Sequence, residues 1–267
     1  MNATTASIPP IELYRQIGGA AAPVVIDIRP APSHDERLIV SALRRAPGDV
    51  AQWSRELASG RRVVIYGDRD DVSKDVVAAL RASGADMVAL EGGFAAWTAA
   101  GLPTRRAIGA TSKWVTRERP KIDRIACPWL IRRFIDPGAE FIYVPTPKVL
   151  EVARQVGGTP YDIEGVEFAH EGERCSFDTI LRIFDIHDPA VDQLAVIVRG
   201  ADTSRHDLAG QCGGLFAISL GLSANFADDH EMLGHGMVMY DALYTWCRSL
   251  QHETHNWPTV KQRAAAS

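Results

Sequence analysis

Three short apolar runs, separated by segments with helical patterns, place the strongest constraint on the fold of the first hundred residues. The runs are residues 24–28, 62–66 and 87–90. Continuous apolar runs of this length, rich in β-branched residues in the first two cases, are typical of strands buried in a sheet. Strands that alternate with helices indicate a parallel sheet wrapped by helices. We therefore expect an α/β fold for the N-terminal half.

Helices are expected around these runs, at residues 11–17, 50–57, 73–82 and 94–99. Ser73 can cap the third of them, because its side-chain oxygen accepts a hydrogen bond from a free backbone N–H of the first turn. Gly84 can end it, because Gly readily adopts the left-handed conformation that follows many helices. The polar loop 67–72 comes directly after the second strand.

Two motifs of this half resemble the rhodanese family, over about residues 8–104. Asp27-Ile28-Arg29 matches the early Asp-x-Arg motif, and Leu90 to Trp97, followed by Gly101-Leu102-Pro103, matches the closing motif. In an active rhodanese, a nucleophilic cysteine begins the loop after the second strand and carries the transferred sulfur as a persulfide. Gly67 occupies that position here. The resemblance therefore implies a degenerate rhodanese-like domain without thiosulfate sulfurtransferase activity, which remains a candidate contact surface for a protein partner.

Basic residues outnumber acidic ones in the stretch from Lys113 to Pro137. Pro128 fits the first turn of a helix, where its missing N–H costs nothing. The apolar residues that follow form one helical stripe, and Asp136-Pro137 ends the helix.

We place the boundary between the two halves in the Pro- and Gly-containing segment 102–112.

Arginines at the edge of this predicted helix are candidate oxyanion ligands, because guanidinium binds a tetrahedral dianion with two hydrogen bonds. The candidates are Arg124, Arg132 and Arg133. The alternative is a structural helix whose arginines extend along apolar surface or pair with nearby acids.

Several motifs of the second half, in order, resemble the chromate-resistance ChrB-type domain. They are Asp123-Arg124, Ala126-Cys127, Trp129 to Pro137, His170-Glu171-Gly172, Cys175-Ser176-Phe177, Ala201-Asp202, Asp228-Asp229 and Tyr240 to Tyr244. We assign this domain to residues 112–250 and a tail to residues 251–267. The resemblance implies a role in chromate resistance, through sensing or handling of chromate or another oxyanion.

The periodicity of this second half predicts a mainly helical α+β domain. Strands are expected at residues 139–144 and 166–169. Helices are expected at residues 148–156, 177–184, 188–199, 215–222 and 231–250.

Polar side chains between these elements are candidate metal ligands. Asp123, His170, Glu171 and Asp202 lie in the segments that resemble the ChrB-type domain. A mixed set of His and carboxylate ligands suits iron, manganese or zinc. No local run has a recognised metal spacing, so these residues would have to meet across the fold. No catalytic residue is assigned.

The four cysteines are scattered and include no CxxC pair, which is typical of reduced thiols in a cytosolic protein. Cys127 and Cys175 are candidate redox-sensitive thiols, because Arg124 and His170, near them in the sequence, favour a thiolate. The alternative is that both are small buried apolar residues.

A net charge of −4 argues against a chain-wide nucleic-acid binder, and no helix-turn-helix pattern is visible, so direct DNA binding is not expected. No signal peptide or membrane-spanning run is visible, which predicts a cytoplasmic protein without a membrane partner. Two alternatives to oxyanion sensing stay open. One is a metal-dependent enzyme acting on a sulfur-containing or oxyanion substrate, and the other is a non-catalytic binding module.

Overall fold

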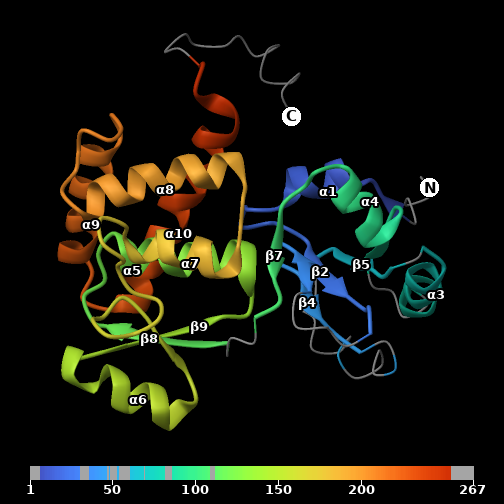
Figure 1. The fold of residues 1–267 in the computed structure, drawn as a ribbon, viewed down its shortest axis with the longest axis horizontal. Coiled ribbons are helices and arrows are strands. Elements are labelled where there is room, and N and C mark those ends of the chain that lie inside the picture. The colour runs from blue at the N-terminus through green and yellow to red at the C-terminus, as the bar shows by residue number, and fades with distance from the viewer. Residues whose placement is uncertain are drawn as a thin grey trace.

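The computed structural model describes residues 7–30, 36–46, 48, 53, 61–68, 70–81, 86–108 and 112–253. The chain forms an α/β lobe (residues 7–108, the N-terminal lobe) beside a larger, mainly helical lobe (residues 112–253, the C-terminal lobe), as Figure 1 shows. The predicted fold class, a parallel sheet wrapped by helices followed by a mainly helical α+β part, is confirmed.

A five-stranded parallel sheet with the order β1-β6-β5-β2-β4 forms the centre of the N-terminal lobe. Its strands are β1 (Ser7–Ile8), β2 (Val24–Asp27), β4 (Leu43–Arg44), β5 (Val63–Tyr66) and β6 (Met87–Leu90). Every residue of β2, β5 and β6 is buried, which explains why their sequences are continuous apolar runs.

Helices cover both faces of this sheet. They are α1 (Pro10–Gln16), α3 (Asp70–Arg81) and α4 (Gly93–Ala99). Val77 of α3 belongs to the same apolar cluster as Ile26 and Ile65 on one face. On the other face, alternate strand residues belong to a cluster that includes Leu13 of α1 and Trp97 of α4.

A second pair of strands in this lobe was not predicted. β3 (Arg37–Ile39) runs antiparallel to β7 (Thr104–Arg106). Strand β7 belongs to the segment that leads into the C-terminal lobe. The predicted helix 50–57 lies outside the described residues, except for Trp53. The Trp53 indole N–H donates a hydrogen bond of 2.9 Å to the carbonyl oxygen of Ala46.

The C-terminal lobe contains a small parallel sheet with the order β10-β8-β9. Its strands are β8 (Lys113–Arg117), β9 (Glu140–Val144) and β10 (Thr159–Pro160). A 3-10 turn, η3 (Thr146–Lys148), leads into α6 (Val149–Val156), which packs against β8. The predicted strand at 166–169 is wrong, because only Phe168 pairs there, in an isolated bridge with Tyr161. Gly165, at a φ of 81°, bends the chain instead.

Five α-helices and two π-helical segments surround this sheet. They are α5 (Asp123–Leu130), η2 (Ile131–Ile135), α7 (Ser176–Phe184), α8 (Pro189–Asp202), α9 (Cys212–Asn225), α10 (Asp229–Thr245) and η4 (Trp246–Leu250). Helix α5 lies at the centre of the lobe, in contact with α7, α8 and α10 (Figure 1).

The predicted start of the central helix at Pro128 is wrong, because α5 already begins at Asp123 and holds Pro128 in its interior. A proline there has no N–H to donate to the carbonyl one turn earlier, which belongs to Arg124. The hydroxyl of Tyr143 donates to that carbonyl instead, at 3.4 Å. A side chain from β9 thereby replaces the backbone bond that the proline removes.

The two lobes meet at a junction with buried polar and apolar contacts. Arg248 of η4 donates hydrogen bonds to the carbonyl oxygens of Tyr14 and Ile17, at 2.6 and 3.0 Å. The Tyr14 hydroxyl donates to Asp188 at 2.6 Å. Gly18, at a φ of +90°, lies against the ring of Tyr244, where a Cβ would collide with it. One apolar cluster runs through both lobes, so the lobes form one packed unit.

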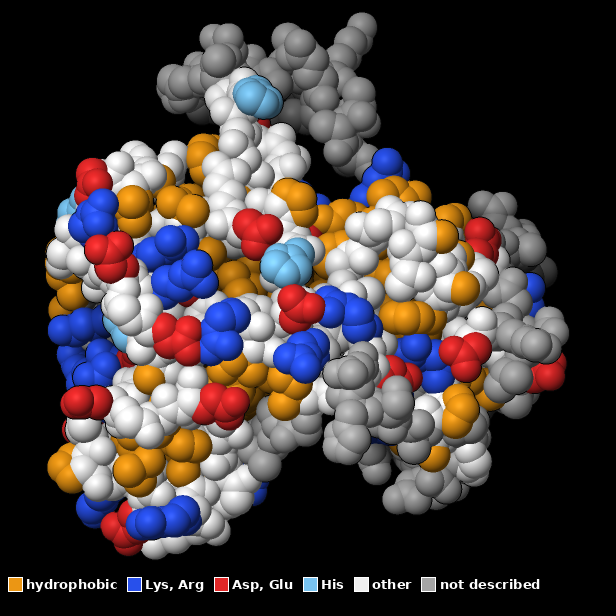
Figure 2. Space-filling model, viewed as in Figure 1, with side chains coloured by type: hydrophobic (Ala, Val, Ile, Leu, Met, Phe, Trp, Pro, Cys, Tyr) orange, Lys and Arg blue, Asp and Glu red, His pale blue; other side chains and the backbone are white. Residues whose placement is uncertain are grey.

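The charged surface of the chain is mixed. On the face in view in Figure 2, basic and acidic side chains are interspersed over the C-terminal lobe among the residues that are coloured. Among the described residues, no helix combines the length and the apolarity that crossing a bilayer requires.

Candidate metal centre

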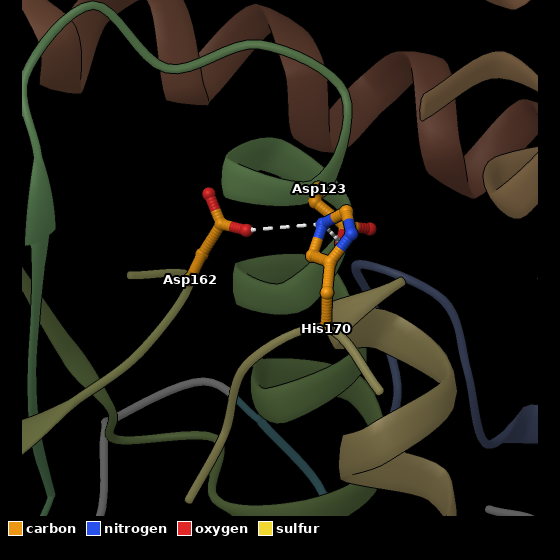
Figure 3. Close-up of side chains that lie close together, drawn as sticks. All are labelled: Asp123, Asp162 and His170. Carbon is orange, nitrogen blue, oxygen red and sulfur yellow. Dashed lines mark ion pairs between the residues drawn. The ribbon is translucent and has the colours of Figure 1, made fainter. Parts of the chain in front are cut away.

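Asp123, Asp162 and His170 of the C-terminal lobe form a group that could hold a metal ion (Figure 3). One ligand atom from each lies within 4.8 Å of the others. His170 Nε2 lies 3.5 Å from Asp123 Oδ2 and 3.6 Å from Asp162 Oδ1. The two carboxylate side chains are 1% and 5% exposed, whereas the imidazole is 45% exposed. The group is therefore buried on one side and open on the other.

Loop 162–170 supplies two of the three side chains from its two ends. Asp162 adopts a φ of 52°, a left-handed conformation that Asp tolerates better than most residues. Its backbone N–H donates to the carbonyl oxygen of Phe168 at 2.9 Å. This bond, with the bridge between Tyr161 and Phe168, closes the loop and brings Asp162 close to His170.

Asp123 is the first residue of α5, and its carboxylate is only half satisfied. Its Oδ2 atom accepts the backbone N–H of Ser176, the first residue of α7, at 2.5 Å. Its Oδ1 atom is buried and has no hydrogen-bond partner among the described residues. Burial raises the pKa of Asp123 to about 7, against the opposing effect of the hydrogen bond to His170. A buried oxygen without a partner is rare in proteins and marks a place where an ion can bind.

Asp162 is held by three other side chains. Its Oδ1 accepts the Ser176 hydroxyl at 2.9 Å, and its Oδ2 accepts Arg117 at 2.9 Å. Arg124 Nε lies 3.3 Å from the same Oδ2. Burial raises the pKa of Asp162, but the hydrogen bonds from His170, Arg117 and Ser176 outweigh it and hold that pKa below its usual range. This carboxylate therefore stays ionised.

A third carboxylate reaches the same imidazole. Asp202, the last residue of α8, places Oδ2 at 3.1 Å from His170 Nε2. Hydrogen bonds to Asp123, Asp162 and Asp202 raise the pKa of His170 to about 12, although burial opposes the shift. A protonated imidazole and the guanidinium groups of Arg117 and Arg124 together balance the three carboxylate charges. A divalent cation would offset two and release the imidazole proton.

A cleft of about 340 Å³ opens beside the centre. Its lining residues are Arg117, Asp162, Ile163, Glu164, Gly165, Val166, Ala169 and His170. Carboxylate oxygens and an imidazole nitrogen suit iron, manganese or zinc. An ion held by these side chains could keep a coordination position open towards the cleft, which is typical of sites that bind a further ligand.

The comparisons with known proteins agree with this division of the chain. Residues 114–247 match the sequence profile of the ChrB C-terminal domain. The chain belongs to the ChrB C-terminal domain family. Residues 10–100 match the profile of the rhodanese-like domain. Both family resemblances predicted from the sequence are therefore confirmed.

One curated relative is the protein ChrB of Cupriavidus metallidurans, which is 33% identical over 136 residues. The match covers 50% of this chain and 40% of that protein, so the chain spans less than half of its relative. The name of the family places the chain in a chromate-related context.

Solved structures similar to the chain each match a little over a third of it. A full-length protein from Lactobacillus plantarum is 23% identical, over 38% of this chain and 88% of that chain, with a TM-score of 0.36. A rhodanese-related protein from Thermoplasma volcanium is 21% identical, over 37% of this chain and 95% of that chain, with a TM-score of 0.34. A thiosulfate sulfurtransferase from Pseudomonas aeruginosa is 28% identical, over 39% of this chain and 20% of that chain, with a TM-score of 0.35.

The structure brings together three of the four predicted metal ligands of the ChrB-family lobe, namely Asp123, His170 and Asp202. Glu171 lies apart from them, because its carboxylate is paired with Arg182, whose Nε donates to it at 2.9 Å. Asp162 was missed. Only its position, directly after a short strand and before a Gly turn, could have indicated it, and that signal is weak.

The predicted oxyanion ligands do not converge on one site. Arg133 makes two hydrogen bonds of 2.8 Å to the carboxylate of Asp241. Arg132 donates to the carbonyl oxygen of Ala139 at 3.1 Å. Arg124 alone lies at the metal centre, where it faces Asp162. The expected cradle of Arg124, Arg132 and Arg133 is thus replaced by separate pairings, and Arg117, which was not predicted, joins Arg124.

The predicted redox thiols are inaccessible. Cys127 and Cys175 are both fully buried. Burial, with the nearby Asp123 carboxylate, raises the pKa of both thiols. The expectation that Arg124 and His170 favour a thiolate is contradicted, because desolvation disfavours the charged sulfur more strongly.

Gly67, the residue that the sequence comparison predicts at the cysteine position of an active rhodanese, directly follows β5. Its carbonyl oxygen accepts the backbone N–H of Phe94 at 3.1 Å. A Cβ on Gly93 would collide with that carbonyl, so the two backbones approach closely. Arg69 and the side chains of Asp70, Asp71 and Val72 lie outside the described part of the loop.

Proposed function

We propose that this ChrB-family chain holds a divalent transition metal at Asp123, Asp162, His170 and Asp202, and binds chromate or another small oxygen anion there. The observation that supports this most strongly is the convergence of one ligand atom each from Asp123, Asp162 and His170 within 4.8 Å, together with a second Asp123 oxygen, Oδ1, that is buried without a partner among the described residues. A buried polar atom that lacks a partner is costly, and a bound cation would change the charge around it.

The surrounding residues have defined roles in this proposal. Ser176 orients both buried carboxylates, through its backbone N–H to Asp123 and its hydroxyl to Asp162. Arg117 and Arg124 fix the other oxygen of Asp162, so that Oδ1 faces His170. Outer contacts of this kind set the orientation of metal ligands and tune the metal. When bound, the metal would act as a Lewis acid towards the oxygen atoms of an anion.

Elemental analysis of purified protein, after incubation with Mn²⁺, Fe²⁺ or Zn²⁺ and dialysis, tests the metal centre. We expect about one equivalent in the wild type, because three ligand atoms converge and Asp202 reaches the same imidazole, and much less in His170→Ala and Asp202→Ala. Glu171→Ala is the matched control and should keep its metal, because Glu171 is paired with Arg182. Equal metal in wild type and His170→Ala, or none in folded wild type, would refute the centre.

Calorimetric titration with chromate then tests the anion-binding part of the proposal. Metal-loaded wild type should bind chromate, and metal-free protein should bind it at least tenfold more weakly, because Arg117 and Arg124 are already paired with Asp162. Equal affinity in the two forms would show that the metal has no part in anion binding.

In the same proposal, the N-terminal lobe transfers no sulfur. The support is the sequence, which has Gly67 at the cysteine position and no cysteine before Cys127. A thiosulfate:cyanide sulfurtransferase assay should give no rate above the uncatalysed background, with an active rhodanese as the positive control. A clear rate that is lost on Asp68→Ala would contradict this expectation. The lobe is also a candidate surface for a protein partner.

A further inference from the structure

The cleft beside the metal centre has features that narrow the class of anion. We propose that its natural ligand is a small organic monocarboxylate with a short apolar body. This inference rests on the metal centre proposed above, and it concerns which oxygen anion the centre binds.

The size of the cleft favours an organic molecule. Ligand-binding pockets in proteins occupy about 300 to 1,000 Å³. A cleft of about 340 Å³ therefore fits a small organic ligand. The cleft is also large enough for a hydrated tetrahedral oxyanion, so the lining of the cleft decides between the two.

One wall of the cleft is apolar. Ile163, Val166 and Ala169 line it, and each is half-buried. All three belong to loop 162–170, whose two ends carry metal ligands. A ligand with one oxygen-bearing end at the metal would place its other end against this wall, where an apolar body is favoured because it leaves water.

The charge balance favours a single negative charge on the ligand. The carboxylates of Asp123, Asp162 and Asp202 are accompanied by the guanidinium groups of Arg117 and Arg124. With a divalent cation and a neutral imidazole, this group carries one net positive charge. A monoanion neutralises it, whereas a dianion leaves an excess negative charge. Glu164, exposed at the edge of the cleft, further disfavours a dianion.

Arg117 adds a positive charge at the wall of the cleft. It lines the cleft, and its side chain is 37% exposed. Its NH2 group donates to Asp162, but its Nε is buried without a hydrogen-bond partner among the described residues. A positive charge at this wall favours an anionic ligand, and the net charge counted above favours one that carries a single negative charge.

Calorimetric titration of Zn²⁺-loaded protein with acetate, isobutyrate and chromate tests this inference. Isobutyrate adds two methyl groups to acetate, so it should bind roughly tenfold more tightly if the apolar wall covers them. Chromate should bind more weakly than isobutyrate. In Val166→Asp, the preference for isobutyrate over acetate should disappear while the zinc content stays unchanged. Glu167→Gln, on the same loop but outside the lining of the cleft, is the control and should keep the preference.

The outcomes separate the two proposals. Equal binding of acetate and isobutyrate by zinc-loaded wild type, or tighter binding of chromate, would overturn the carboxylate assignment and leave the metal centre intact. A preference that survives Val166→Asp would also overturn it. Folded protein that retains no Zn²⁺, Mn²⁺ or Fe²⁺ would overturn both.

Discussion

Each lobe contains a buried group of charged side chains, and the two groups differ in how completely their carboxylate oxygens are paired. In the N-terminal lobe, Asp27 is fully buried and accepts hydrogen bonds from Arg29, Arg44 and Tyr66. Glu36 pairs with Arg44 as well. Burial raises the pKa of Asp27, but the hydrogen bonds from Arg29 and Arg44 outweigh it and hold that pKa below its usual range. Two carboxylates thus face two guanidinium groups, and the group is complete in itself.

The group in the C-terminal lobe balances its three carboxylates only with Arg117, Arg124 and a protonated His170, and one Asp123 oxygen has no hydrogen-bond partner among the described residues. Burial, with the nearby charges of Asp202 and Asp162, raises the pKa of Asp123 to about 7. Both groups consist of buried Asp side chains with neighbouring Arg side chains. The comparison indicates that a buried carboxylate oxygen without a partner, more than residue type, distinguishes a candidate ligand site from a structural network.

The largest effect should come from Asp27→Ala, which breaks the complete group. Removing this carboxylate leaves Arg29, a side chain only 6% exposed, without its main partner. Breaking a buried ion pair from one side costs about 3–5 kcal/mol. Urea unfolding should show a loss of this size. Glu12→Ala, in the exposed pair with Arg15, is the control and should cost less than about 1 kcal/mol. A loss below 1 kcal/mol in Asp27→Ala would mean that the pairing contributes little.

The incomplete group should respond to metal instead. A metal present at about 100 times its dissociation constant stabilises the folded state by about 2.7 kcal/mol. Urea unfolding of wild type with and without Zn²⁺ should show this increment, and Asp162→Asn should lack it. Asp27→Asn should keep the increment, because Asp27 lies in the other group. An equal increment in wild type and Asp162→Asn would place the metal elsewhere.

A smaller effect concerns how the contribution of Asp27 to the free energy of unfolding depends on pH. Its folded pKa lies below the value of about 3.9 for a free Asp, so ionised Asp27 contributes stability above pH 4. That contribution is lost as the pH falls through the folded pKa. The difference in unfolding free energy between wild type and Asp27→Asn should therefore be constant from pH 5 to 7 and shrink below about pH 4. A difference that grows on acidification would mean that the pKa shift has the opposite sign.

The sequence predicted the N-terminal sheet well because its central strands are buried on both faces and therefore apolar throughout. The missed strands, such as β4 (Leu43–Arg44), are too short for a pattern and include arginines. In the C-terminal lobe, the buried stripe of the central helix was evident, but its start was not. Tyr143 donates to the carbonyl that Pro128 leaves without a backbone partner, a contact that the sequence of the helix does not reveal.

The metal centre could be predicted only in part. Asp123, His170 and Asp202 lie in family motifs, whereas Asp162 reaches the centre through a left-handed backbone turn that no periodicity reveals. The arginines were misjudged for a related reason. Asp241, the partner of Arg133, lies 108 positions away in the sequence, so its pairing appears only in the folded chain.

The junction between the lobes also has a consequence for the order of events during synthesis. Arg248 donates to the carbonyls at the end of α1, and it follows Ile17 by 231 positions. A ribosome adds about 5–20 residues per second, so these carbonyls wait on the order of ten to fifty seconds for their partner. Until then, the hydrogen bonds from Arg248 to α1 cannot form. The first described helix of the chain therefore reaches its final environment only when the last one is in place.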